Sequence, residues 1–562
     1  MSWPLLHGSL LMVMFLTCPV WADAVVTNCS SGTQPGAGLN LAQAVTYGGR
    51  ITFQCADPNA SVIPIEQPIA IIGTITIDGE NNVTLGVWDR PPLFTVAGRR
   101  RQITLSNLRI WAVPNRDCTS PSTSNCPPSP RSPVGAIAMG DMDVVLEHVI
   151  VENVVQPIRL DHGSATISDS EFRGGTGPLV RGPNVTINRT TINRPVGDAL
   201  AAWGMVTLDN VSVFGSGTDS DLPSTFDNCR LTISNSLFTG VRSQAPQGGA
   251  IRSGCDTEVH HSRFISNGAT KGGAIFVGAA APRIVIQSAV FEENVASSEG
   301  GAVAFEPSWE GRQLEILWSH FRRNVANGSG GAISLVGQPP TPTLLQLNAV
   351  SFKQNHAVQR GGAIAAENAS LVIGRSLFLE NEAGSGSAIS MIAPQGIQSI
   401  VAANLIAAGG VSPGAAALEL AGGMILNSTI VANKGVGLRA SRQTRLSNTV
   451  VSRNTEKNCF GTGQIVDGGA NSQFPDATCG AWPIVDPKLD NFFIPALDSQ
   501  LLNAGNDQVC GSEWVAAKDF YGARRPRLQH CSIGAVEGDI QHLFNVPPAI
   551  RARAREQRFT FP

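Results

Sequence analysis

Short apolar runs recur along the whole chain, and glycine or asparagine follows each run closely. Valine, isoleucine, threonine and phenylalanine dominate these runs, whereas stretches rich in alanine, leucine and lysine are scarce. Runs of β-branched and aromatic residues bounded by turn residues are typical of short strands joined by tight turns. The pattern therefore predicts an all-β protein and argues against a helical one.

Two short phrases repeat through the middle of the chain with a shared period. The first is Gly-Gly-Ala-Ile or a close variant, which begins at Gly248, Gly272, Gly300, Gly330, Gly361 and Gly386. The second is Phe-x-x-Asn, at Phe264/Asn267, Phe291/Asn294, Phe321/Asn324, Phe352/Asn355 and Phe378/Asn381. Weaker copies extend the repeat in both directions, and from Asp169 to Asn448 successive copies begin 20 to 31 residues apart.

A period of this length built from strands alone predicts a right-handed parallel β-helix, a single-stranded solenoid of stacked coils. Leucine-rich repeats have a similar period, but they require a Leu-x-x-Leu-x-Leu pattern instead of Gly-Gly-Ala. We expect the glycines at a turn with positive φ and the phenylalanines in one internal column. Each asparagine is expected in a left-handed turn, bonded to its copy one coil away. These roles are structural, so the repeat itself offers no functional site.

After its first 22 residues, the chain divides into four parts. We expect the β-helix over residues 76–456, preceded by an N-terminal cap at 23–75 in which residues 39–45 form a capping helix. Residues 457–540 are expected to form a disulfide-containing C-terminal cap, followed by a basic tail at 541–562. Caps are needed because the ends of a strand stack are open edges. A proline-rich segment at 117–133 interrupts one coil and is expected to project as a loop.

The first 22 residues have the features of a secretory signal peptide. An apolar run at 10–16 is followed by Pro19 and by a small-residue end at Ala22; an uncleaved N-terminal anchor is the alternative. Ten cysteines remain after this segment, and they predict five local disulfides: Cys29–Cys55, Cys118–Cys126, Cys229–Cys255, Cys459–Cys479 and Cys510–Cys531. Because disulfides form and persist in oxidising compartments, the cysteine pairs and the signal peptide both predict export to the cell surface, the medium or the periplasm.

The charge of the chain excludes one class of partner. Its 562 residues carry 40 basic and 43 acidic side chains, a formal net charge of −3, which provides no cationic field for nucleic acid phosphates. Beyond the signal, we expect no transmembrane span, because no other segment approaches 18 continuous apolar residues. Arginine outnumbers lysine 34 to 6. This ratio suits bidentate contacts with uronate carboxylates, but genomic composition bias explains it equally well.

Two regions resemble known families. The repeats over residues 245–390 resemble those of the polymorphic outer membrane protein passengers, which are surface-displayed β-helices associated with adhesion. The stretches at 501–505, 519–526 and 531–537 resemble the C-terminal part of secreted bacterial β-helix proteins of the choice-of-anchor Q type. These resemblances imply a secreted or surface-displayed bacterial protein. They imply no particular chemistry, because the wider pectate-lyase-like fold hosts both enzymes and adhesins.

Charged residues concentrate in the less regular coils between residues 159 and 230. Asp161, Arg181 and Asp227 each precede the next strand of the repeat by eight residues, which predicts one column on one face. Such a column suits a glycan cleft, and a solvated ladder of paired turn residues is the alternative. His162 is expected to be a surface histidine. The candidate catalytic, glycan-facing residues are therefore Arg159, Asp161, Arg181, Asp198 and Asp227.

The leading hypothesis is a β-helix that binds polysaccharide or another cell-surface component in the manner of an adhesin. The alternative is a polysaccharide lyase or glycoside hydrolase that acts through the carboxylates at 159–230. No cofactor is expected, and calcium would enter only with the enzymatic alternative, in which Asp clusters hold the ion. The sequence leaves catalysis and the oligomeric state open.

Overall fold

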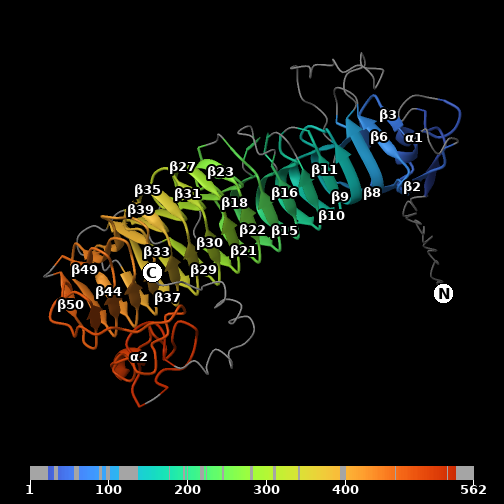
Figure 1. Cartoon of the computed structure of the whole chain (residues 1–562). Helices are drawn as coiled ribbons and strands as arrows, with labels where there is room; N and C mark the ends of the chain where they lie inside the picture. Colours follow the sequence, from blue (N-terminus) through green and yellow to red (C-terminus); the bar gives the residue numbers. More distant parts are fainter. Residues whose placement is uncertain are drawn as a thin grey trace, which may run out of the picture.

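The predicted parallel β-helix is confirmed by a computed structural model of the chain. The model describes residues 23–538 with gaps at 31–35, 56–61, 88–91, 97–100, 113–136, 176, 194–196, 199, 216–220, 223, 244–245, 279–282, 308–311, 339–341, 393–399, 462–463 and 528. Within these residues the chain winds into a rod of stacked coils (Figure 1). Each named strand pairs in parallel with strands one coil away, and 44 of the strands form one continuous sheet.

Each coil contributes strands to three faces of the rod, which we call sheets 1, 2 and 3 in the order in which the chain meets them. Sheet 1 contains β1 (Ala24–Val26), β2 (Gly49–Phe53), β5 (Ile75–Asp78), β21 (Asp256–His260), β25 (Arg283–Gln287), β29 (Gln313–Leu317), β33 (Thr343–Asn348), β37 (Ala369–Gly374), β41 (Ile400–Ala403), β44 (Gly423–Leu426), β47 (Thr444–Ser447) and β50 (Ile465–Asp467).

Sheet 2 contains β3 (Val62–Ile65), β6 (Thr84–Val87), β11 (Glu171–Arg173), β13 (Thr191–Asn193), β16 (Ser212–Phe214), β19 (Leu237–Thr239), β22 (Arg263–Ile265), β26 (Val290–Glu292), β30 (His320–Arg322), β34 (Ser351–Lys353), β38 (Leu377–Leu379), β42 (Ile406–Ala408), β45 (Thr429–Val431), β48 (Val450–Ser452) and β51 (Ser472–Phe474).

Sheet 3 contains β4 (Ile69–Ile71), β7 (Phe94–Val96), β20 (Ile251–Ser253), β24 (Ile275–Val277), β28 (Val303–Phe305), β32 (Ile333–Val336), β36 (Ile364–Glu367), β40 (Ile389–Ile392), β43 (Ala416–Leu420), β46 (Val436–Ala440) and β49 (Lys457–Phe460).

Six long strands run from one sheet into the next: β8 (Arg101–Ala112), β9 (Ala138–Glu152), β10 (Ile158–Ser168), β12 (Val180–Asn188), β15 (Leu200–Asp209) and β18 (Ser224–Ser234). A narrower fourth face between sheets 2 and 3 holds two separate short sheets. These contain β14 (Gly197–Asp198) and β17 (Asp221–Leu222), and then β23 (Gly268–Lys271), β27 (Val295–Glu299), β31 (Val325–Ala326), β35 (His356–Arg360) and β39 (Glu382–Ser385).

The phenylalanines of the repeat form the predicted internal column. The buried rings of Phe238, Phe264, Phe291, Phe321, Phe352 and Phe378 stack with centroids 4.7 to 5.1 Å apart. The Gly-Gly turn is also confirmed: Gly272 has a φ of 64°, and a Cβ on Gly273 would lie 2.2 Å from the carbonyl oxygen of Gly301. Only glycine tolerates so close an approach of neighbouring coils.

The asparagines form the predicted ladder, with one correction. From Asn267 to Asn355, each amide NH₂ donates to the Oδ1 of the asparagine one coil on, at 2.9 to 3.0 Å, and all are buried. The expected left-handed conformation at the asparagine was wrong, because positive φ belongs to the preceding residue, such as Ser266 (55°) and Arg323 (53°). The preceding residue adopts the left-handed conformation, and the asparagine side chain stays buried with its hydrogen bonds formed.

The N-terminal end begins with stacked strands and the expected short helix. α1 (Leu41–Val45) starts at a capping box, in which Asn40 Oδ1 accepts from Gln43 N at 2.8 Å and Gln43 Oε1 accepts from Asn40 N at 3.1 Å. The helix buries Leu41, Ala44 and Val45 in the main core. β1 pairs in register with β2, and β2 pairs with β5, so coil stacking begins within the expected cap.

The C-terminal part both extends the stack and folds back beside it. β49, β50 and β51 form a further coil beyond residue 456, and buried Trp482 packs on the core after it. Residues 486–538, which we call the C-terminal segment, then lie along the outside of sheet 2, where Phe493, Phe520 and Ile533 pack against residues of β38, β42, β45 and β48. Figure 1 shows this segment, with α2 (Asp507–Cys510), beside the rod.

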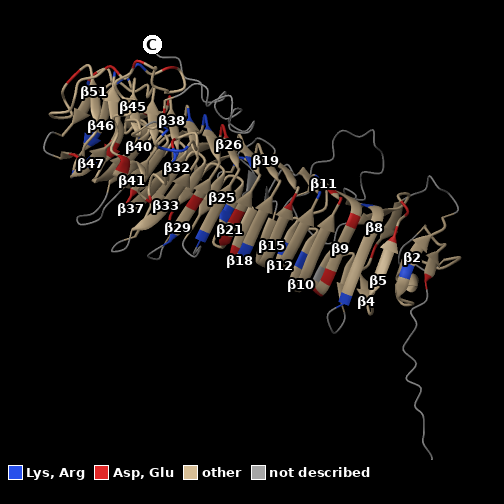
Figure 2. Ribbon diagram, turned by 90° about the horizontal axis from the view of Figure 1, so that it is seen from below, with Lys and Arg blue, Asp and Glu red and all other residues tan. Residues whose placement is uncertain are grey.

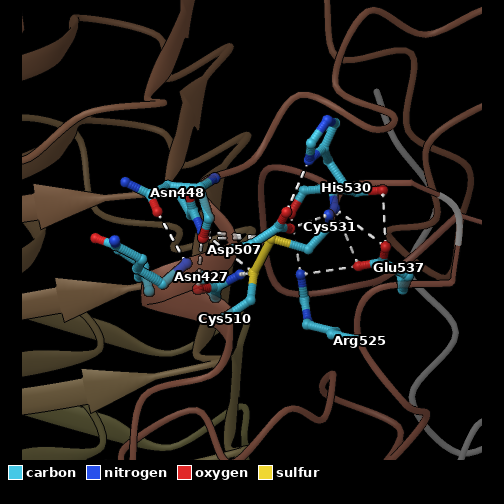
Figure 3. Close-up of a disulfide and its surroundings, with 12 residues drawn as sticks. Asn427, Asn448, Asp507, Cys510, Arg525, His530, Cys531 and Glu537 are labelled. Carbon is cyan, nitrogen blue, oxygen red and sulfur yellow. Dashed lines mark hydrogen bonds and ion pairs between the residues drawn. A yellow bond between two sulfur atoms is a disulfide. The ribbon is translucent and has the colours of Figure 1, made fainter.

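A buried ion pair organises the C-terminal segment (Figure 3). The fully buried Arg525 guanidinium donates to Glu537 Oε2 at 3.1 Å, and to the carbonyl oxygens of Ser532 and Gly534 at 3.0 and 2.8 Å. Burial raises the pKa of Glu537, and the charge of Arg525 opposes this shift. Arg525 and Glu537 lie in the stretches for which the sequence predicts a resemblance to choice-of-anchor Q proteins, and in the structure these two residues stabilise the fold of the segment.

Four of the five expected disulfides are confirmed: Cys29–Cys55, Cys229–Cys255, Cys459–Cys479 and Cys510–Cys531. The fifth expected pair, Cys118 and Cys126, lies outside the described residues. The expected loop at 117–133, the signal at 1–22 and the basic tail at 541–562 lie outside them as well.

Candidate functional site

The residues proposed from the sequence lie on the long strands that run from sheet 3 into sheet 1. Arg159 on β10 and Arg181 on β12 are exposed and are register partners. Asp161 is exposed at a bulge of β10, where the register against β9 shifts between Leu160 and His162. The structure therefore places two arginines side by side, with a carboxylate two residues along the strand from one of them.

The expected single column of Asp161, Arg181 and Asp227 is wrong in register. Arg181 pairs with Ala201, and Ala201 pairs with Thr225, so Asp227 lies two residues past this row. Bulges insert extra residues between the positions that the eight-residue spacing aligned. The backbone of Asp198 lies in β14, on the narrow fourth face, and its side chain is outside the described part of the chain.

An exposed tryptophan lies among these residues and was missed by a search for charged side chains. Trp203 on β15 is 37 % exposed; it is the register partner of Pro183 and lies opposite the bulge that contains Asp227. We call Arg159, Asp161, Arg181, Trp203 and Asp227 the long-strand face. Figure 2 shows charged positions distributed along these strands. The expectation for His162 is confirmed, since its ring is exposed and its Nδ1 lies 2.9 Å from Asp141 Oδ1.

A concave site lies further along the rod, on the outer side of sheet 3. It has a volume of about 530 Å³, within the range of roughly 300–1,000 Å³ found for small-ligand sites. Three arginines and one glutamate are its charged residues, and we call it the arginine groove. Its lining is Arg360, Ser385, Ser390, Met391, Ile392, Glu419, Ala421, Arg439, Ala440, Ser441, Arg442 and Phe460.

The floor of the arginine groove is a row across four neighbouring strands. Ser390 pairs with Glu419, Glu419 with Arg439, and Arg439 with Phe460, on β40, β43, β46 and β49. The Arg439 guanidinium carbon lies 5.3 Å from the centroid of the Phe460 ring, and Lys457 Nζ lies 5.6 Å from the same centroid. Phe460 as a whole is 50 % exposed. Cations stacked on one ring hold its position while leaving part of its surface to solvent.

Two polar atoms in this row are buried without a hydrogen-bond partner in the described structure. They are Arg439 Nε, a donor, and Glu419 Oε2, an acceptor. The contact between the two side chains joins other atoms, Arg439 Nη1 and Glu419 Oε1, at 3.6 Å. Because a buried polar atom without a partner is costly, these two side chains leave one donor and one acceptor unused beside the groove.

Sequence reasoning did not identify the arginine groove, although a signal for it exists. Leu418, Leu438 and Cys459 are inward-facing register partners, and Glu419, Arg439 and Phe460 each follow one of them directly. Glu419 and Arg439 are 20 residues apart, and Arg439 and Phe460 are 21 apart, so this row continues the coil period. The repeat phrases weaken in these coils, so an alignment on those phrases did not extend to this row.

Neither a metal-binding cluster nor a membrane-spanning helix is found in the described part of the chain. No group of three or more His, Cys, Asp or Glu side chains within it is arranged to hold a metal ion. None of its helices is both long enough and apolar enough to cross a bilayer.

Comparison with known proteins places the chain in no family. No protein-family model matches it, and no curated protein matches it. Among solved structures, it is similar to tailspike protein 3 of bacteriophage CBA120, with 10 % sequence identity and a TM-score of 0.23 over 83 % of this chain. The chain spans 63 % of the length of that tailspike chain.

Proposed function

We propose that this protein is an extracellular β-helix that binds acidic polysaccharide through the arginine groove. The observation that carries the proposal is the row of Glu419, Arg439 and Phe460, in which a buried donor and a buried acceptor lack partners beside an exposed ring. Arg360 and Arg442 add positive charge to the same groove. A carboxylate-bearing sugar supplies what each group requires.

The chemistry of a uronate residue matches the groove part by part. A planar guanidinium binds a carboxylate through two parallel hydrogen bonds, which favours Arg439 and Arg442 as the anion site. Glu419 accepts a hydrogen bond from a sugar hydroxyl. Its negative charge repels ligands that carry several negative charges on one group. The apolar face of the sugar ring packs against Phe460 and Ile392.

The remainder of the chain supports an extracellular site of action. Four disulfides join cysteines 20 to 26 residues apart, from Cys29 to Cys531, which is typical of proteins from oxidising compartments. Buried asparagine and phenylalanine ladders give the rod a rigid surface, so a site on sheet 3 is preorganised for an extended chain.

The test measures binding of purified protein to polygalacturonate and to the same polymer after methyl esterification, which removes the charge and retains the sugar backbone. We expect binding to polygalacturonate that weakens with added salt, and about tenfold or greater weakening in Arg439→Gln and Arg442→Gln, because each loses a charged hydrogen bond. Arg323→Gln is the matched control, since Arg323 is an ion-paired arginine in the turn after β30 and does not line the groove. Equal binding of both polymers, or equal loss in the control, would refute the proposal.

The same samples distinguish binding from cleavage. Release of reducing ends or unsaturated products from polygalacturonate would favour the alternative, a lyase or hydrolase. Products that persist in Arg439→Gln but vanish in Asp161→Ala or Asp198→Ala would assign that chemistry to the coils around the long-strand face. Intact polymer after prolonged incubation is the outcome that the binding proposal predicts.

A further inference from the structure

A second groove lies at the seam between the rod and the C-terminal segment. Its volume is about 380 Å³, and we call it the seam groove. The rod side is formed by β29, β33 and β37 and by the turns that follow sheet 1, and the other wall is formed by residues 513–518. Its polar and aromatic lining is Glu315, Gln346, Asn348, Arg375, Asn404, Glu513, Trp514 and Lys518.

The outer wall of the seam groove is anchored to the rod directly after its tryptophan, at Val515 and Lys518. Val515 is buried against Ala403 and Leu426 of the rod, and Asn404 Nδ2 donates to the carbonyl oxygen of Lys518 at 3.0 Å. With Val515 fixed in this way, the adjacent Trp514 stays 41 % exposed at the groove. The aromatic wall is therefore a fixed surface.

The Cys510–Cys531 disulfide ties this wall to the rest of the C-terminal segment and to the rod (Figure 3). The side-chain amides of Asn427 and Asn448, on the turns of the rod, donate to Cys510 Sγ at 3.1 and 3.2 Å. The backbone N–H of Ala517 donates to the carbonyl oxygen of Cys510 at 3.0 Å, which closes the loop that carries Trp514. The position of the tryptophan thus depends on a covalent link formed only under oxidising conditions.

The polar groups of the seam groove suit hydroxyl groups. Asn404 Oδ1 is buried and has no partner among the described residues, so it lacks a donor. Gln346 Oε1 accepts a hydrogen bond from Gln313 Nε2 at 2.7 Å, and Asn348 Oδ1 accepts one from Arg375 Nη2 at 3.1 Å. The side-chain oxygens of Gln346 and Asn348 are therefore occupied, and their NH₂ groups are the ends that can donate to a ligand. A sugar hydroxyl both donates and accepts, and therefore satisfies either type of group.

The charges of this groove balance, in contrast to those of the arginine groove. Glu315 and Glu513 face the same space as Arg375 and Lys518, two negative and two positive residues. Such a lining gives no preference for an anion. A tryptophan face packs well against the C–H groups of a pyranose, because the face of the ring is the negative side of its quadrupole.

We propose that the seam groove is a second binding site, which takes an uncharged pyranose ring stacked on Trp514. This site goes beyond the acidic-polysaccharide site on sheet 3, because it lies on another side of the rod and selects a ligand without charge. It exists only where the C-terminal segment is docked on the rod, so formation of Cys510–Cys531 is a condition for binding.

The test titrates the full chain with cellohexaose, maltohexaose and mannohexaose, followed by tryptophan fluorescence and by calorimetry. We expect at least one of these neutral hexaoses to bind, and Trp514→Ala to weaken that binding about 30-fold, as expected for loss of a central aromatic contact. Trp318→Ala is the matched control, because Trp318 is 47 % exposed on the rod and does not line the groove.

A second variant separates this site from the arginine groove. The double change Cys510→Ser with Cys531→Ser should abolish binding of the neutral hexaose while polygalacturonate binding stays within twofold of the unchanged protein. Failure of all three hexaoses to bind the unchanged protein at millimolar concentration would overturn the proposal. Equal effects of Trp514→Ala and Trp318→Ala would overturn it as well, whatever the result with polygalacturonate.

Discussion

Replacement of Arg525 by methionine tests whether the buried ion pair holds the C-terminal segment on the rod. The substitution removes the partner of Glu537 and the donors to the carbonyl oxygens of Ser532 and Gly534, while Glu537 stays only 2 % exposed. Breaking a buried pair by removing one partner costs about 3–5 kcal/mol, mainly because the remaining charge is left uncompensated.

The loss should be local, because Arg525 lies in the segment that packs outside sheet 2, apart from the main core of the rod. At about 1.4 kcal/mol for each factor of ten, the opened state of residues 486–538 should become about 100-fold to 4,000-fold more populated. Hydrogen exchange followed by mass spectrometry measures this opening peptide by peptide. We expect faster exchange in peptides of the C-terminal segment and unchanged exchange in β21 to β37.

Two variants control this experiment. Arg524→Met changes the neighbouring exposed arginine and should leave exchange unchanged. Arg525→Met combined with Glu537→Leu replaces the whole pair by apolar side chains and should restore much of the protection, since such replacements are often neutral. If Arg525→Met and Arg524→Met exchange alike, the ion pair does not hold the segment and the reasoning fails.

Three further predictions concern other parts of the molecule. Asn324→Leu interrupts the asparagine ladder at its middle and leaves the carbonyl oxygen of Phe291 and the amides of Asn294 without their partner; at about 1–3 kcal/mol for each group, the thermal midpoint should fall by several degrees, whereas the exposed control Gln354→Leu should not change it. The hydrogen bond from His530, then that from the Cys531 backbone, lowers the pKa of Asp507. The stability gained from the ionised carboxylate is therefore complete above its ordinary pKa of about 4 and is lost as the pH falls through the lower folded value. The difference in urea midpoint between the unchanged protein and Asp507→Asn should shrink between pH 6 and pH 3, and a constant difference would contradict the assignment. On the long-strand face, Trp203→Ala should leave the affinity for polygalacturonate within twofold of that of the unchanged protein. A loss of affinity equal to that of Arg439→Gln would indicate that the main binding site is the long-strand face.

The fold could be predicted from the sequence because its determinants repeat. Side chains such as Phe264 and Asn267 have the same environment as their copies in the neighbouring coils, so a periodic pattern identifies their role without coordinates. The cysteine pairs were predictable for a related reason, since residues one coil apart in sequence, such as Cys229 and Cys255, lie beside each other in a stack.

The candidate sites were less predictable because they depend on departures from the repeat. Bulges in β10 and β18 moved Asp161 and Asp227 out of the row of Arg181, and spacing alone gives no indication of a bulge. The arginine groove depends on register partners in coils where the repeat phrases weaken. The seam groove joins Asn404 to Lys518, residues 114 positions apart, and no periodicity relates the C-terminal segment to the rod.

The most direct measurement of the proposed function is a crystal structure of the protein with hexagalacturonate. The account predicts a sugar carboxylate within hydrogen-bond distance of the guanidinium of Arg439 or Arg442, with a hydroxyl on Glu419 and the ring against Phe460. An oligosaccharide bound on the long-strand face, or an arginine groove without sugar at saturating ligand, would contradict it.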